Sequence, residues 1–264
     1  MSYRDKNYET MKLEFRGAVA VVRFDRPEAM NAANIPMSHE RLEIYTGLSA
    51  DPEVKAVIVT GNEKAYCAGG DLAAFVQFDQ SQALKFAERG LDYQKALMDM
   101  PKPTIAAVAG GAFGGGMENV LLCDLRIAAE NAKFALSEIN VGIFPGGGGT
   151  QRLVQSISIC KAKEMIFLGK PVDAAAALEM GLVNKVVPLE SLMDAAMEWA
   201  EALCRKATLS LAAAKRLVNE AWNQDIYAGM RMEIEAWSKI YGTNDQKEGM
   251  QAFLEKRKPS FRGN

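Results

Sequence analysis

The sequence predicts an α/β fold, in which mostly parallel strands alternate with helices, followed by a helical C-terminal region. Short apolar runs rich in β-branched residues recur along the first two-thirds of the chain, often bounded by Gly or Pro, as is typical of buried strands. Segments of helical periodicity separate these runs, and such alternation favours parallel pairing. From about residue 189 strong helix formers dominate, so we expect a core over residues 1–189 and a helical region over residues 190–264.

The apolar pattern also places the individual elements. The five expected strands cover residues 18–24, 56–60, 104–108, 125–128 and 183–187. Apolar residues at helical spacing predict helices over 36–48 and 82–98, and an apolar segment after a glycine run predicts one over 120–125. The C-terminal helices, three or four in number, are expected at about 189–205, 209–223, 225–241 and 244–255.

The charge of the chain is close to balanced. Its 31 Lys and Arg face 33 Asp and Glu, which gives a formal net charge of −2 over 264 residues. Because nucleic-acid-binding proteins usually carry a strong basic excess, no nucleic-acid partner is expected. The polar N-terminus lacks the apolar core of a signal peptide, and no apolar run reaches membrane-spanning length. We therefore expect a cytoplasmic protein without a membrane partner.

Cysteine and histidine offer little scope for metal chemistry. The four cysteines are scattered without CxxC spacing, so neither a zinc site nor a disulfide framework is expected. His39 is the one histidine, and it lies in a segment of helical spacing where an exposed position is the simplest interpretation. No metal is expected.

Three glycine-rich stretches carry the strongest functional signal, at residues 67–72, 110–119 and 145–150. None contains the Gly-Lys-Ser/Thr of a phosphate-binding P-loop, and the dinucleotide fingerprint GxGxxG is absent in register. Two of the stretches follow expected parallel strands, whose carboxyl ends are where α/β sheets gather ligands. Backbone N–H groups exposed there by glycine could form an oxyanion hole. The alternative is that these glycines only form tight turns.

Two carboxylates stand close to these glycines. Glu118 follows the second glycine run, and Glu138 lies in the mostly apolar segment 134–139. Burial among apolar residues raises the pKa of a carboxyl group, and two such groups near one another suit general acid/base catalysis. The alternatives are that Glu118 stabilises a helix N-terminus and that Glu138 lies on the surface beside a strand.

These residues resemble the crotonase (enoyl-CoA hydratase/isomerase) family over nearly the whole chain. The resemblance is carried by the stretches RPEAMNAANI (26–35), AYCAGGDL (65–72), the segment 106–153, GLVNKVV (181–187) and EGMQAFLEKRKPSF (248–261). It implies a spiral of ββα repeats whose C-terminal helical region packs in trimers, often paired into hexamers. It also implies that the substrate is an acyl-CoA, so that coenzyme A is part of the substrate and no separate cofactor is needed.

The resemblance further implies roles for individual residues. The Gly70 and Gly115 N–H groups would hold the thioester oxygen, within a substrate-binding stretch that includes Ala68, Asp71 and Leu72. Glu118 and Glu138 fall at the positions of the acid/base pair that hydratases use to add water to a 2-enoyl-CoA. Phe253 and Lys256 match positions where a neighbouring subunit contacts the CoA nucleotide, and the alternative is a solvated basic C-terminus.

Two departures from the family pattern bear on the substrate. Ala73 stands where many members carry a Lys that contacts the CoA nucleotide, and Asn119 stands where leucine is usual. We expect Asn119 to add a polar group beside the acid/base pair, and an acyl group other than a simple straight chain. The alternatives to a hydratase are an enoyl-CoA delta isomerase, another acyl-CoA lyase or hydrolase of the family, and a non-catalytic CoA- or RNA-binding relative.

Overall fold

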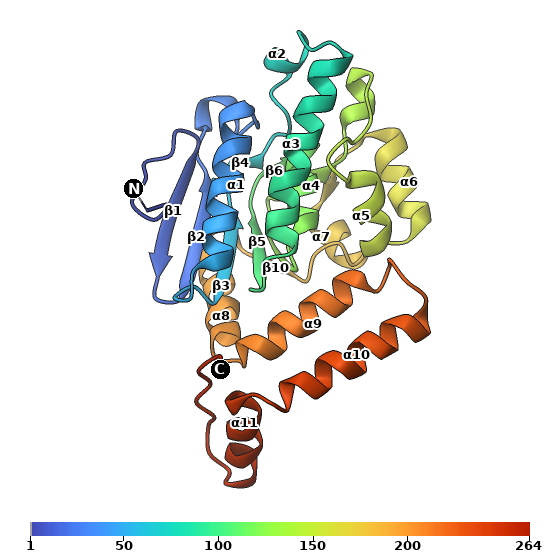
Figure 1. Cartoon of the computed structure of the whole chain (residues 1–264). Helices are drawn as coiled ribbons and strands as arrows, with labels where there is room; N and C mark the ends of the chain where they lie inside the picture. Colours follow the sequence, from blue (N-terminus) through green and yellow to red (C-terminus); the bar gives the residue numbers. More distant parts are fainter. Residues whose placement is uncertain (1) are drawn as a thin grey trace.

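The computed structural model describes residues 2–264 and contains two β-sheets with helices packed around them (Figure 1). The six-stranded sheet has the order β1 (Met11–Arg16), β2 (Val19–Phe24), β3 (Ala56–Thr60), β5 (Thr104–Val108), β7 (Leu125–Ala129) and β10 (Lys185–Val187). The four-stranded sheet has the order β4 (Ala65–Cys67), β6 (Gly111–Phe113), β8 (Lys133–Ala135) and β9 (Val172–Asp173).

From β3 to β8, successive strands of the chain alternate between the two sheets. In the pairs β3–β4, β5–β6 and β7–β8, the first strand joins the six-stranded sheet and the second joins the four-stranded sheet. Neighbouring strands are parallel except for β1 with β2 and β8 with β9, which are antiparallel. Helices follow each pair, so the chain forms the repeated ββα arrangement that the family resemblance implied.

The helices of the first two-thirds of the chain are α1 (Ile35–Ala50), α2 (Leu72–Phe75), α3 (Gln80–Met98), α4 (Gly115–Leu122), α5 (Gly149–Ser156), α6 (Ile159–Leu168) and α7 (Ala174–Glu179). Short 3-10 helices lie at η1 (Pro27–Ala29), η2 (Glu138–Val141) and η3 (Leu189–Ser191). Helix α3 begins with a capping box, in which the side chains of Asp79 and Gln82 each accept a hydrogen bond from the other's backbone N–H. The C-terminal helices are α8 (Leu192–Cys204), α9 (Thr208–Glu220), α10 (Ile226–Ile240) and α11 (Asn244–Leu254).

The six-stranded sheet is buried on both faces, which explains its continuous apolar runs. In β3, Val57 and Val59 face the apolar layer that includes α1 and α4, whereas Ala56 and Ile58 face a second layer formed with α8. Alternate residues of a strand point to opposite faces, so both sets had to be apolar. Helix α8 thus packs with the core, and the expected division after residue 189 stays a prediction.

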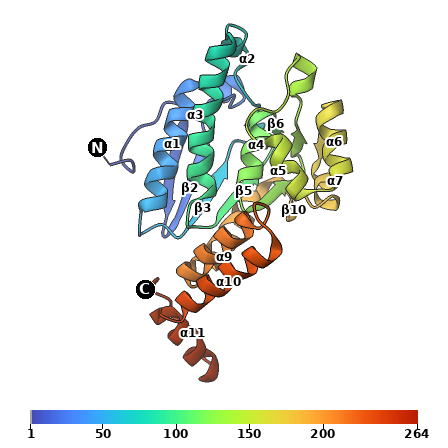
Figure 2. The same ribbon diagram turned by 45° about the vertical axis from the view of Figure 1, so that its right-hand side comes forward.

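Helices α9, α10 and α11, which we call the arm, extend away from the sheets (Figures 1 and 2). The arm is tied to the core where Lys215 Nζ pairs with Asp124 Oδ2 at 2.9 Å and donates to the Lys102 carbonyl at 3.0 Å. The Asn219 side chain also donates to the Met98 carbonyl. Within residues 2–264, none of the helices combines the length and apolar character that crossing a membrane requires.

Most expected elements are confirmed, and the differences have local causes. The strands predicted over 56–60 and 104–108 have those bounds in the structure. The helix predicted over 120–125 is wrong in position, because α4 already begins at Gly115 and the chain turns into β7 at Leu125. The short strands β4, β6, β8 and β9 and the first strand β1 were not predicted.

Candidate active site

Two glycine turns meet at the carboxyl ends of β4 and β6, which are parallel neighbours. Gly69 has φ +104° and Gly114 has φ +49°, both in the left-handed region that favours glycine. A side-chain carbon at position 69 would lie 3.5 Å from the Gly115 nitrogen, so the turns are in contact. The carboxyl ends of two parallel strands thus bring together residues more than 40 positions apart.

The predicted donors, Gly70 and Gly115, both have free N–H groups. Within residues 2–264 neither N–H donates a hydrogen bond, although the flanking Ala68 and Asp71 N–H groups donate to backbone carbonyls and fix the first turn. Gly115 is the first residue of α4, where N–H groups lack partners in the helix and the dipole is positive. Such N–H groups are suited to stabilising a developing oxyanion.

An aromatic cluster covers one side of the first turn. A side-chain carbon at Gly70 would lie 2.2 Å from the Phe75 ring, which therefore packs directly on the glycine. The Phe75 ring centroid lies 5.3 Å from that of Phe78 and 4.7 Å from that of Phe86. Sequence reasoning missed this cluster, because three half-buried phenylalanines in α2, in α3 and in the loop between them carry no motif.

Glu118 lies one turn into α4 and is 7% exposed. Its Oε1 atom accepts hydrogen bonds from the Gly147 N–H at 2.7 Å and the Gly149 N–H at 2.9 Å. Burial raises the pKa of Glu118, and these two hydrogen bonds favour the ionised form and oppose that rise. The third glycine stretch therefore holds the Glu118 carboxylate, which its sequence did not reveal.

Glu138 begins η2 and faces the same glycine turn from the other side. Its Oε1 would lie 3.3 Å from a side-chain carbon at Gly114, and Glu118 Oε2 would lie 3.9 Å from one at Gly115. Burial raises the pKa of Glu138 to about 7, and the negative charge of Glu118 adds to the rise. Both carboxylates therefore flank one residue pair, and the raised pKa of Glu138 suits it to proton transfer near neutral pH.

The other predicted substrate-binding residues differ in where they lie. Asp71 pairs with Arg26 at 3.2 Å, so its carboxylate fixes the turn, and Leu72 is exposed beside it. Phe253 is 82% exposed on α11, and Lys256 is exposed just beyond that helix. Helix α11 lies at the far end of the arm, away from α2 and α4 (Figure 1), so one chain alone does not bring its residues to the glycine turns.

The expectation that Asn119 places a polar group beside the acid/base pair is wrong. Its side chain is buried and accepts a hydrogen bond from the Tyr66 hydroxyl at 2.6 Å, in the core between β4 and α4. Successive residues of a helix point about 100° apart, so Asn119 faces away from Glu118. Ala73 is exposed, and His39 is an exposed residue of α1, as predicted.

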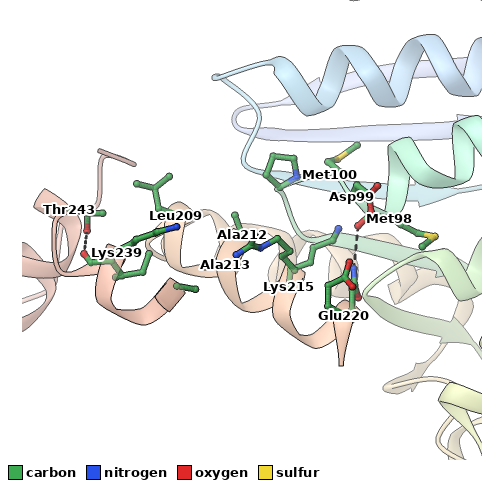
Figure 3. A pocket seen from close by; sticks show the side chains of 15 residues that line it. Met98, Asp99, Met100, Leu209, Ala212, Ala213, Lys215, Glu220, Lys239 and Thr243 are labelled. Carbon is green, nitrogen blue, oxygen red and sulfur yellow. Dashed lines mark hydrogen bonds between the residues drawn. The ribbon is translucent and has the colours of Figure 1, made fainter. Parts of the chain in front are cut away.

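A groove of about 600 Å³ lies between the end of α3 and the arm (Figure 3). Met98 and Met100 line its core side, while Lys215 and Lys239 line the arm side. The glycine turns and the two glutamates do not contribute to it. Across residues 2–264, no three His, Cys, Asp or Glu side chains are grouped so that they could hold a metal ion.

A solved structure shares this architecture. The crystal structure of an enoyl-CoA hydratase from Bacillus anthracis has a TM-score of 0.94 and 34% identity, covering 97% of this chain and 100% of that chain. The alternating sheets and the facing glycine turns thus define an α/β protein of the crotonase class. Residues 14–264 match the family described as Enoyl-CoA hydratase/isomerase, and the chain belongs to that family.

Two relatives are similar over nearly their whole lengths. The "Crotonyl-CoA hydratase" of Syntrophomonas wolfei is 40% identical over 255 residues, which are 96% of this chain and 98% of that protein. The "Short-chain-enoyl-CoA hydratase" of Clostridium acetobutylicum is 40% identical over 247 residues, which are 93% of this chain and 95% of that protein. The family resemblance drawn from the sequence is therefore confirmed.

Proposed function

We propose that the protein is an enoyl-CoA hydratase, which reversibly adds water to a 2-enoyl-CoA to give a 3-hydroxyacyl-CoA. The observation that carries the proposal is the convergence of two free N–H groups and two carboxylates on Gly114 and Gly115. The two relatives, whose names specify hydration of crotonyl-CoA and of short-chain enoyl-CoA, support it.

The proposed mechanism uses each group for one task. The Gly70 and Gly115 N–H groups bind the thioester oxygen and stabilise the enolate that forms when hydroxide adds at Cβ. A water molecule held between the carboxylates loses a proton to Glu118, whose anionic form the Gly147 N–H stabilises. Glu138 then delivers a proton to Cα, so one water is added syn across the double bond. This scheme requires no metal or redox cofactor.

Isomerisation of the double bond is the main alternative within the family. Moving a double bond needs only a proton removed from one carbon and returned to another, which one carboxylate could perform. The Glu118 carboxylate, held by two backbone N–H groups, favours hydration because water activation needs a second group. Conversion of a 3-enoyl-CoA without hydration of any 2-enoyl-CoA would establish the isomerase instead.

The direct test is loss of the conjugated-thioester absorbance with a panel of straight-chain, branched and cyclic 2-enoyl-CoAs. Replacing Glu118 or Glu138 by Gln should lower kcat about 100-fold or more, because each variant loses one proton-transfer group. Glu130→Gln, at an exposed glutamate after β7, is the matched control and should retain activity. An unaffected Glu118→Gln would overturn the two-carboxylate mechanism. Titration of the protein with CoA and with RNA, alongside the hydration assay, tests the alternative that it is a non-catalytic CoA- or RNA-binding relative.

We also propose that the chain assembles as a trimer or a dimer of trimers through its arm. The arm exposes large apolar side chains that no part of the described chain covers, among them Trp222, Ile226, Ile234, Trp237 and Phe253. Patches of this kind mark interfaces in soluble proteins. Ile234→Asp should reduce the mass measured by sedimentation, while Glu233→Ser on the same helix should not. The cytoplasmic location stays a prediction, which cell fractionation tests.

A further inference from the structure

One buried hydrogen bond joins the two segments that carry the candidate site. Tyr66 is the middle residue of β4, which leads directly into the turn containing Gly70. Asn119 lies on α4, which begins at Gly115 and also carries Glu118. The Tyr66 hydroxyl donates to the Asn119 Oδ1 atom at 2.6 Å, and both side chains are almost completely buried.

The relative position of these segments sets the spacing of the two free N–H groups. A side-chain carbon at Gly115 would lie 3.8 Å from the Gly70 nitrogen, and one at Gly116 would lie 2.0 Å from the Cys67 carbonyl oxygen. The two segments are therefore in close contact at these glycines. The Tyr66–Asn119 hydrogen bond adds a directional side-chain contact between β4 and α4, a few residues from each glycine.

The surroundings of this bond are unusual for a protein core. Asn119 Nδ2, Tyr45 Oη and Arg41 Nε are buried, and none has a hydrogen-bond partner within residues 2–264. The Arg41 guanidinium stacks between the Phe24 ring at 4.6 Å and the Tyr93 ring at 5.1 Å, and it forms no ion pair in the described chain. Unpaired buried polar groups cost free energy, so an apolar side chain at position 119 would relieve part of that cost. The Asn119 side chain therefore costs free energy where it lies, and the hydrogen bond that it makes there is the one from Tyr66.

We propose that Tyr66 and Asn119 are positioning residues for the enolate-binding N–H pair. Their hydrogen bond holds α4 against β4, so that the Gly70 and Gly115 N–H groups point at one oxygen atom and Glu118 stays beside the acyl group. This inference rests on the proposed hydratase function. It predicts that the bond acts on the transition state, where charge develops on that oxygen, more than on binding of the substrate.

The test uses Tyr66→Phe and Asn119→Leu, each of which removes the bond. Both variants should lower kcat and kcat/KM about ten-fold with little change in KM, as expected for an interaction made in the transition state. The double variant should lose no more than the larger single loss, because the two residues share one bond. Tyr8→Phe is the matched control, since it removes a tyrosine hydrogen bond, to the Tyr3 carbonyl at 3.1 Å, that lies outside the candidate site. Equal activity of Tyr66→Phe and Tyr8→Phe would overturn the proposal.

A binding measurement separates this proposal from the hydratase assignment. A 3-ketoacyl-CoA can bind as its enolate, which places negative charge on the thioester oxygen, whereas a saturated acyl-CoA cannot. Tyr66→Phe should weaken binding of the 3-ketoacyl-CoA about ten-fold and leave binding of the saturated acyl-CoA unchanged. If the unaltered chain hydrates no enoyl-CoA but Tyr66→Phe shows this selective loss of binding, the hydratase proposal fails and the positioning role stands. If the unaltered chain hydrates an enoyl-CoA but Tyr66→Phe binds both ligands as tightly as the unaltered chain does, the positioning role alone fails.

Discussion

The junction between β4 and α4 differs from the arm in what completes its packing. At the junction the packing contacts come from the same chain: the Tyr66 hydroxyl donates to Asn119 Oδ1, and Gly116 packs against the Cys67 carbonyl. The arm instead leaves large side chains such as Trp237 exposed. The comparison teaches that one folded chain can bring the candidate site together, whereas it leaves the apolar side chains of the arm uncovered, as the proposed assembly with other copies would require.

The junction should be the part least tolerant of added volume. Gly116→Ala would place a carbon 2.0 Å from a backbone oxygen, which cannot move without shifting β4. We expect the free energy of unfolding to fall by about 3 kcal/mol or more, measured by urea denaturation. Gly146→Ala is the control, because nothing lies within 4 Å of its added carbon. Similar stability of the two variants would refute the close packing described for α4.

Breaking the ion pair between core and arm should lower the free energy of unfolding by less than the change at Gly116. Lys215 Nζ is 2.9 Å from Asp124 Oδ2, and the two side chains are only 10% and 22% exposed. Lys215→Met should lower the free energy of unfolding by about 2 kcal/mol, since it leaves a largely buried carboxylate without its cation. Lys161→Met, which breaks an ion pair that is more than half exposed, should cost less than about 0.5 kcal/mol. Thermal unfolding compares them, and equal losses would show that the arm is not held by this pair.

The free energy of unfolding should depend on pH, because folding buries the Glu138 carboxyl group. The pKa of Glu138 is about 7 in the folded chain, raised by burial from its ordinary 4.5. Its contribution to stability is therefore present below about pH 4.5 and lost as the pH rises through 7. Glu138→Gln should be more stable than the unaltered chain by about 1 kcal/mol at pH 8, a value reduced from the full shift by partial solvent access. The gain should vanish near pH 4, and a gain independent of pH would contradict the raised pKa.

The smallest effect is expected where the arm would meet a neighbouring site. If Lys256 of one copy contacts the CoA phosphate of another, Lys256→Ala should raise KM for an acyl-CoA about three-fold, as an exposed charge contact allows. KM for the corresponding pantetheine thioester, which lacks the nucleotide, should not change. Lys258→Ala, at a nearby exposed lysine, is the control. Equal KM changes for both substrates would show that Lys256 does not act through the nucleotide.

The sequence predicted the larger elements because each had a pattern long enough to read. Residues 105–108 are apolar throughout, since that strand is covered on both faces. The three-residue strands β4, β6 and β8 could not be predicted, because so short a segment has no periodicity. Their strand character comes from pairing with partners far away in the chain.

The sequence likewise predicted the residues of the candidate site but not their arrangement in space. Glycine turns and nearby carboxylates could be recognised at Gly70, Gly115, Glu118 and Glu138, since residue type and order along the chain identify them. Their closeness could not, because contacts such as Gly147 to Glu118 span 29 positions. The direction of Asn119 was misjudged for the same reason, since neighbours in sequence on a helix face different surroundings.

By itself, the sequence determined the α/β class, the family and the residue types available for chemistry, because these depend on local pattern and on the order of motifs. Only the tertiary structure decided that Glu118 and Glu138 face one glycine turn, that burial raises the pKa of both, and that Tyr66 binds Asn119. Burial, electrostatic coupling and hydrogen bonding depend on distances through space, and the packing of two sheets and their helices sets those distances.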